Sequence, residues 1–251
     1  MNKKKNFIHF RLIWYWIVVF SLLAGACNRS KPVSEAARFD RVASKVFKEV
    51  YPALAGQILE DYGITKGTCL DIGCGPAYLS IQLAKASDLE IIGVDIDSEA
   101  VRIAKRNVRR AGLADRIQIE AGDVHRLRFA DGEADLIVSR GSFLFWNDRV
   151  QAFKEVYRVL KPNGVAFIGG GMGRSIPPEK KEGIKKKLEA AGIVRSNRPT
   201  VTRYEMEETL DLAGIPSYRI VGDGPTDAGC KCGMWVEIRK TASKASSKAG
   251  T

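Results

Sequence analysis

Apolar residues along the chain follow two patterns that alternate. Short apolar runs end in Gly, Asp, Asn or Pro, as buried strands do. Between them lie stretches whose apolar residues recur at helical spacing, such as Val101, Ala104 and Val108. A chain that alternates in this way predicts an α/β fold, in which a mostly parallel sheet carries helices on both faces.

Breakers and capping residues place several helix ends within this pattern. Pro52 is expected to divide two helices that precede the first strand. Gly112 is expected to end a helix that begins after Ser98, and Thr202 and Glu205 have the spacing of a capping box. The strands are expected at residues 67–72, 91–95, 117–124, 134–140, from 165 onward, 218–221 and 234–239.

The first strand ends in a glycine-rich turn that can hold a ligand. Gly73 and Gly75 allow the chain to turn sharply into the next helix and leave room against bare backbone. Asp71 lies at the carboxyl edge of the sheet, where it could receive an ammonium group. Asp95 ends the second strand, and a carboxylate there is placed to accept both hydroxyls of a ribose.

A nicotinamide dinucleotide would also present a ribose at this edge, but the turn argues against it. The dinucleotide fingerprint requires a third glycine where this chain has Tyr78, and Pro76 and Tyr78 crowd the space that a pyrophosphate needs. Asp71 would repel a pyrophosphate. The pattern therefore favours a nucleoside ligand without phosphate.

These segments, together with residues 117–124, 134–140 and 159–165, resemble the motifs of class I S-adenosylmethionine (SAM) methyltransferases. The resemblance covers residues 35 to 239, and we expect a methyltransferase domain over residues 33–239. It implies a Rossmann-like, doubly wound sheet of seven strands that is mostly parallel. The last strand would be antiparallel and would pair with the preceding strand as a hairpin.

The resemblance also implies the ligands and the residues that hold them. SAM would be the cofactor and S-adenosylhomocysteine (SAH) the product, with no metal. In the family, the acid after the third strand takes the adenine amino group, and here that acid is Asp123. One departure is Ala77, where many members place a third glycine. The residues expected to bind the cofactor are Asp71, Gly73, Cys74, Gly75, Asp95, Ile96, Gly122, Asp123, Val124 and Ser139.

Residues for the acceptor side of the reaction are expected after the fourth and fifth strands. The candidate catalytic residues are Arg140, Ser142 and Trp146. Arg140 could hold an anionic substrate or pair with a neighbouring carboxylate. The segment Gly169–Gly173 lacks the lysine and hydroxyl of a phosphate-binding loop, so we expect a mobile active-site loop there. His125 lies near the adenine side and is expected to be a surface residue rather than a general base.

The net charge of +11 comes almost entirely from the two ends of the chain. Residues 1–31 and 239–251 carry ten Lys and Arg residues and no acid. The expected domain is therefore close to neutral, and no nucleic-acid partner is expected. Residues 240–251, rich in Ser, Ala and Lys, are expected to form a disordered basic tail.

Residues 1–30 predict a signal peptide or a membrane anchor. Lys3 to Lys5 form a positive segment, an uncharged apolar run follows, and small residues precede Cys27. This is typical of a bacterial lipoprotein signal, with Cys27 as the lipidation candidate. A retained anchor and a misplaced start are the alternatives. We expect membrane association and leave the side open, because both exporting interpretations remove the domain from the cytoplasmic supply of SAM.

The function expected from these patterns is transfer of a methyl group to a small-molecule or lipid-like acceptor. One alternative is a non-catalytic, membrane-anchored binding module that keeps the methyltransferase fold. Another is a metalloid methyltransferase of the arsenic type, in which Cys230 and Cys232 supply soft ligands.

Overall fold

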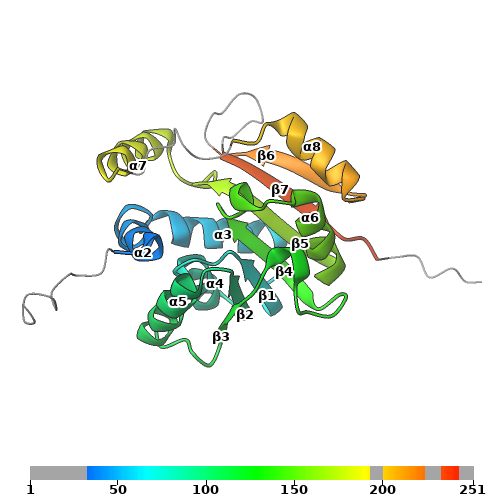
Figure 1. The fold of residues 1–251 in the computed structure, drawn as a ribbon, viewed down its shortest axis with the longest axis horizontal. Coiled ribbons are helices and arrows are strands. Elements are labelled where there is room, and N and C mark those ends of the chain that lie inside the picture. Colours follow the sequence, from blue (N-terminus) through cyan, green and yellow to red (C-terminus); the bar gives the residue numbers. More distant parts are fainter. Residues whose placement is uncertain (1–32, 193–199, 224–232, 243–251) are drawn as a thin grey trace, which may run out of the picture. The chain divides into compact units, whose positions relative to one another are not determined.

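The fold is organised around one sheet of seven strands (Figure 1). The computed structural model describes residues 33–192, 200–223 and 233–242, and residues from Glu35 onward form one compact unit. The strand order is β3-β2-β1-β4-β5-β7-β6, and β7 runs antiparallel to both neighbours. The predicted fold class is thereby confirmed. The strands are β1 Lys66–Ile72, β2 Asp88–Asp95, β3 Ile117–Ala121, β4 Ala134–Arg140, β5 Leu160–Gly171, β6 Tyr218–Gly222 and β7 Gly233–Arg239.

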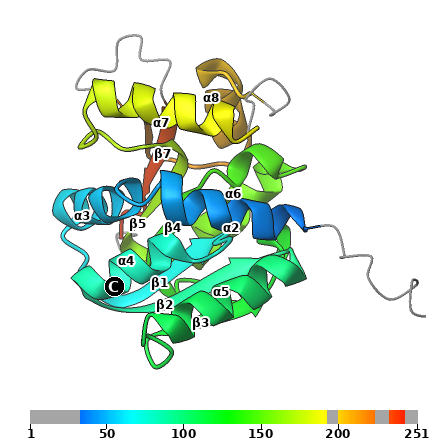
Figure 2. The ribbon, with the colours of Figure 1, turned by 90° about the vertical axis from the view of Figure 1, so that its left-hand side faces the viewer.

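Seven described helices and two short 3-10 turns accompany the sheet. In two perpendicular views α2 and α3 lie between α7 on one side and α4 and α5 on the other (Figures 1 and 2). Their bounds are α2 Glu35–Val46, α3 Val50–Tyr62, α4 Tyr78–Ala86, α5 Ser98–Arg110, η1 Val124–Arg126, η2 Phe143–Phe145, α6 Arg149–Val159, α7 Pro178–Ala190 and α8 Arg203–Leu212.

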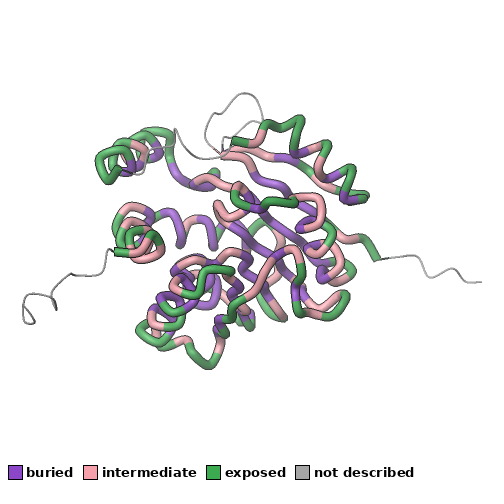
Figure 3. Tube along the Cα trace, viewed as in Figure 1, coloured by how far each residue is buried: buried purple, intermediate pink, exposed green. Residues whose placement is uncertain are grey.

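Alternate residues of the central strands face two separate cores. Cys69 of β1 belongs to the core under α3, α4 and α5, whereas its neighbour Leu70 belongs to the core under α6 and α8. Phe167 and Ile168 divide between the same two cores in β5. Figure 3 shows that buried residues follow the central strands. Strands buried on both faces need continuous apolar sequences, and this accounts for the apolar runs in the chain.

Several predicted boundaries differ from the structure, and β2 begins at Asp88, three residues before the predicted start. Pro52 lies in the first turn of α3 rather than between helices, because a proline there leaves no amide that needs a partner. β3 ends at Ala121, before the acid that was expected to close it. β5 begins at Leu160, ahead of Pro162.

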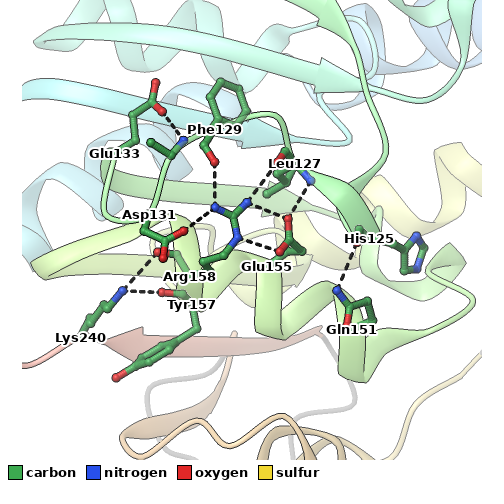
Figure 4. Close-up of polar contacts among 11 residues, drawn as sticks. His125, Leu127, Phe129, Asp131, Glu133, Gln151, Glu155, Tyr157, Arg158 and Lys240 are labelled. Atoms are coloured by element: carbon green, nitrogen blue, oxygen red, sulfur yellow. Dashed lines mark hydrogen bonds and ion pairs between the residues drawn. The ribbon is translucent and has the colours of Figure 1, made fainter.

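The segment between η1 and β4 is fixed to α6 by one arginine (Figure 4). The Arg158 guanidinium donates to the backbone oxygens of Leu127 and Phe129, at 3.1 and 2.8 Å, and to the carboxylates of Asp131 and Glu155. These bonds hold the chain that follows the predicted adenine-binding acid, and so limit where that acid can lie.

Several predictions fall on residues that the structure does not describe. They concern residues 1–30 with Cys27, the pair Cys230 and Cys232, and most of the tail 240–251. Within the described ranges, none of the helices has the length and apolar character needed to cross a membrane.

Candidate cofactor and acceptor site

A cavity of about 990 Å³ opens at the carboxyl ends of the central strands. The glycine turn after β1 and the acids after β2 form one part of its wall. The rest comes from the segment after β4, the end of β5, the start of β7, and residues of helices α2, α5 and α7. The residues that line it include Phe39, Val42, Phe47, Gly73, Gly75, Asp95, Asp97, Arg140, Ser142, Phe143, Phe145, Met172 and Met234.

The glycine turn has the backbone conformation that its sequence requires. Gly73 and Gly75 have φ values of +66° and +53°, in the left-handed region. The backbone nitrogens of Gly73 and Cys74 both donate to the Val94 oxygen, at 2.7 and 3.1 Å, and so tie the turn to β2. Ala77 also has a positive φ, +62°, which gives a physical reason for the glycine that many relatives carry at this position.

Asp95 is held by the turn and by the start of α5. Its Oδ2 accepts from the Gly75 nitrogen at 2.8 Å, and its Oδ1 accepts from the Asp97 nitrogen at 3.0 Å. Each carboxylate oxygen has a second lone pair, so both oxygens keep one acceptor position for a ribose hydroxyl. Burial raises the pKa of Asp95 above its usual value. The geometry fits the predicted contact with the ribose diol.

Asp71 lies beneath the floor of the cavity rather than in its lining. Its carboxylate is 2% exposed and accepts from the Ser80 hydroxyl at 2.5 Å. Burial, reinforced by the nearby Asp95 charge, raises the pKa of Asp71 to about 6, while the Ser80 hydrogen bond opposes the rise. The predicted direct contact with the SAM ammonium stays a prediction, but the charge lies just under the glycine turn.

The affinity for SAM is therefore expected to depend on pH through Asp71. Above its pKa of about 6 the carboxylate is charged and attracts the cationic methionyl group; below it the group is neutral and the attraction is lost. We expect the Kd for SAM to rise about fivefold to tenfold as the pH falls through this range. Calorimetric titrations at several pH values would measure it.

Two comparisons isolate the contribution of Asp71. The neutral ligand methylthioadenosine keeps the adenosine but lacks both positive charges, so its Kd should change much less with pH. In Asp71→Asn the extra pH dependence of SAM over methylthioadenosine should disappear. Equal pH profiles for the two ligands on the unmodified protein would contradict the assignment.

Four further residues predicted to bind the cofactor lie after β2 and β3 but do not line the cavity; among them Asp123 is the acid predicted to contact adenine. Ile96 is 75% exposed and directly follows Asp95, the acid predicted to bind the ribose. Asp123 caps η1 and accepts from the His125 nitrogen at 3.0 Å and from Nδ1 of that ring at 2.6 Å, which lowers the pKa of Asp123. A side chain at Gly122 would overlap Val94, because an added Cβ would lie 2.6 Å from its Cγ1. Val124 is buried. Their roles toward the cofactor stay predictions.

His125 has a partner for each ring nitrogen. Nδ1 lies against Asp123, and Nε2 accepts from the Asp148 nitrogen at 3.3 Å. This arrangement requires the neutral tautomer with the proton on Nδ1. It agrees with the expectation that His125 is not a general base.

The segment after β4 brings together only part of the predicted acceptor side. Ser142 lines the cavity; its hydroxyl lies 2.6 Å from that of the buried Ser139 and donates to the Ile72 oxygen at 3.1 Å. Trp146 is 6% exposed and packs on Phe153 of α6, so its predicted catalytic role is not supported. Phe145, 62% exposed, lines the cavity instead.

The expectation of a mobile loop at Gly169–Gly173 is wrong for most of its length. Gly169 to Gly171 belong to β5 and pair with Trp235, Met234 and Gly233 of β7. The next two backbone nitrogens, of Met172 and Gly173, donate to the Asp223 carboxylate at 2.6 and 3.0 Å. The segment is a fixed wall of the cavity.

Asp223 is the residue that the sequence analysis missed. It is 1% exposed, and it also accepts from the Trp235 indole at 2.6 Å, while the buried Lys181 donates to its backbone oxygen at 2.6 Å. Its available signal was an acid directly after a predicted strand, in the sequence Gly222-Asp223. Nothing local in the sequence identifies its partners, which are the two backbone nitrogens just after β5, the Trp235 indole of β7 and the Lys181 side chain of α7.

The described cysteines do not present thiols to the cavity. Cys74 is 8% exposed and its Sγ packs toward Gly93, so any contact with the cofactor would come from its backbone. Burial raises the pKa of the thiols of Cys69 and Cys74 well above the usual value. Across the described residues, no three His, Cys, Asp or Glu side chains are grouped as metal ligands.

Comparison with known proteins agrees with this geometry. The model of the methyltransferase domain family matches residues 70–168. A crystal structure from Methanococcus maripaludis, provisionally assigned as an S-adenosyl-L-methionine-dependent methyltransferase, is 39% identical; the alignment covers 84% of this chain and 94% of that one, with a TM-score of 0.71. The chain belongs to the class I SAM-dependent methyltransferase family, whose cofactor is SAM.

Two curated relatives show how wide the family is. The erythromycin 3''-O-methyltransferase of Saccharopolyspora erythraea is 31% identical over 192 residues, which are 65% of this chain and 63% of the relative. The ribosomal protein L11 methyltransferase of Pelotomaculum thermopropionicum is 32% identical over 149 residues, which are 59% of this chain and 45% of the relative. The chain thus spans less than two thirds of the length of either relative. The two relatives are named for different methyl acceptors, erythromycin and a ribosomal protein.

Proposed function

We propose that the protein transfers the methyl group of SAM to a small-molecule or lipid-like acceptor bound in the same cavity, and releases SAH. The observation that carries this proposal is the continuity of the cavity, which joins the glycine turn and Asp95 to the apolar residues after β4. Its volume of about 990 Å³ lies at the upper end of the roughly 300–1,000 Å³ of small-molecule sites. A cofactor and a modest acceptor can share it.

The chain has little chemistry to supply. Bound SAM provides an electrophilic methyl group, so the protein must orient an acceptor in line with it and exclude water. Gly73, Gly75 and Asp95 are placed to hold the cofactor, and Ser142 with the surrounding apolar side chains is placed to position the acceptor. The described lining includes no histidine and no cysteine; its carboxylates are Glu35, Asp95 and Asp97, and none of them is assigned as a general base.

The test is calorimetric titration of SAM and SAH into the full-length protein, followed by measurement of SAH release with a panel of acceptors. Micromolar binding and acceptor-dependent SAH release would support the proposal. Binding without release by any acceptor would favour the non-catalytic binding module, and a folded protein that binds neither ligand would contradict the cofactor assignment.

We further propose that the N-terminal segment attaches the protein to a membrane. Support comes from the lysines at positions 3 to 5, the uncharged apolar run and Cys27 in the printed sequence. Fractionation of cells that produce the protein or its Cys27→Ser variant, with labelling by a fatty acid, would test it. A protein that remains in the soluble fraction and takes up no label would contradict the attachment.

A further inference from the structure

Arg140 presents a fixed cation to the cavity. It is the last residue of β4, and its Nε donates to the Gly171 oxygen of β5 at 3.0 Å. Its guanidinium carbon lies 4.2 Å from the centre of the Phe47 ring and 5.1 Å from that of Tyr51. One backbone oxygen and two aromatic rings thus orient the group before any ligand binds.

No carboxylate in the described part of the chain lies within ion-pair distance of Arg140. Two other partly buried arginines differ: Arg106 pairs with Asp40 at 2.6 Å, and Arg158 with Glu155 at 2.8 Å. A half-buried cation loses hydration and gains from an anionic partner. The sequence analysis left open whether Arg140 pairs with a neighbouring carboxylate, and the described structure provides none.

Three acids line the cavity: Glu35 lies at the start of α2, and the two aspartates lie on the cofactor side. Asp95 and Asp97 follow β2, which is separated from β4 by β1 in the sheet. Asp95 accepts from the glycine turn, and Asp97 caps α5 through the Glu99 nitrogen at 2.8 Å. Negative charge therefore gathers where the ribose is expected, and the positive charge of Arg140 lies across the glycine turn from it.

The cavity wall also carries many apolar side chains, beside the charged Glu35, Arg38 and Arg41 of α2. Those apolar side chains include Phe39, Val42, Phe47, Phe143, Phe145 and Met234. Phe145 is 62% exposed and lines the cavity, so its ring is available to contact a ligand. A ligand that satisfies both features has an apolar body and one anionic group.

We propose that the methyl acceptor is such an amphiphilic anion, whose carboxylate or phosphate group pairs with Arg140 while its apolar body contacts the surrounding aromatic side chains. The planar guanidinium suits both groups, because it can donate two parallel hydrogen bonds. This inference rests on the proposed methyltransferase function and specifies the class of its acceptor.

The experiment uses the full-length protein saturated with SAH. Decanoate, its uncharged match decanamide, and decyl phosphate are titrated calorimetrically into the unmodified protein and into Arg140→Met and Arg140→Lys. Methionine keeps an apolar side chain against Phe47 and removes the charge. The exposed Arg110 of α5, which does not line the cavity, provides the matched control as Arg110→Met.

We expect the unmodified protein to bind at least one of the two anions about tenfold or more tightly than decanamide. Arg140→Met should remove this preference, Arg140→Lys should keep part of it, and Arg110→Met should leave it unchanged. The anion that binds more tightly identifies whether the acceptor group is a carboxylate or a phosphate.

Three results would overturn the inference. The anions and decanamide may be bound equally, or none of the three may bind to protein that holds SAH. Alternatively, Arg140→Met could weaken SAH itself about tenfold and leave the anion preference intact, which would assign Arg140 to the carboxylate of the cofactor. Failure of the proposed function is a separate observation, since the unmodified protein would then either not bind SAH or form no SAH from SAM with any acceptor.

Discussion

Replacement of Gly73 by alanine is expected to abolish detectable SAM binding and to lower the free energy of unfolding by about 3 kcal/mol. Gly73 has a φ of +66°, which costs a residue with a side chain about 1–2 kcal/mol. An added Cβ would also overlap the Cβ and hydroxyl of Ser142. The turn must then move away from β4, and the ligand surface moves with it. Chemical denaturation and SAM titration would measure the two effects.

Gly75→Ala separates backbone strain from the overlap. Gly75 has a similar φ of +53°, but an added Cβ there would meet only Phe39, at an ordinary 3.6 Å. Its loss of stability should therefore be limited to about 1–2 kcal/mol. In the double variant Gly73→Ala with Ser142→Gly the overlap is absent. Its loss of stability should therefore fall from that of Gly73→Ala to about that of Gly75→Ala. A Gly73→Ala protein no less stable than Gly75→Ala would contradict the proposed overlap.

The elements that could be predicted share one property: their sequences meet local requirements. β1, β2 and β4 are buried on both faces, so they carry apolar runs whatever their neighbours are. The glycine turn could be predicted from its two glycines, because only glycine adopts such backbone angles without strain. The capping box of Thr202 and Glu205, observed at the start of α8, is likewise complete within four residues.

The features that could not be predicted depend on partners far along the chain. Glycines at 169 to 171 favour a loop locally, yet they lie in β5 and pair with β7. An added Cβ would overlap Trp235 of β7 at Gly169 and the Asp223 carboxylate at Gly171. Trp146 and Phe145 are adjacent, and which of them enters the core is decided by the position of α6.

The acceptor side of the cavity likewise depends on residues that are far apart in the sequence. Arg140 was a candidate from its place at the end of a strand, but its orientation depends on Phe47, which lies 93 residues earlier in the chain. The cofactor side is built from residues at the ends of adjacent parallel strands, so its members could be inferred together from the sequence. The acceptor side is assembled from α2, β4, β5 and β7, and sequence order does not reveal that meeting.

Asp95→Ala is expected to weaken SAM and SAH about a hundredfold or more. Each hydrogen bond to a charged group contributes about 1.5–3 kcal/mol when its loss leaves a partner unpaired, and Asp95 is placed to accept from two ribose hydroxyls. The same substitution removes the acceptor for the Gly75 nitrogen, so thermal unfolding must show that the variant is folded at the temperature of the titration.

A change in the ligand distinguishes the ribose contact from a general disturbance of the turn. The unmodified protein should bind SAH about tenfold more tightly than 2′-deoxy-SAH, because the missing hydroxyl removes one of the two bonds to Asp95. Asp95→Ala should bind both ligands with nearly the same weak affinity. If the variant still prefers SAH by the full factor, another group reads the 2′-hydroxyl, and Asp95 acts only through its hold on Gly75. If the preference disappears, the carboxylate at the end of β2 contacts the ribose directly, as its two remaining lone pairs indicate.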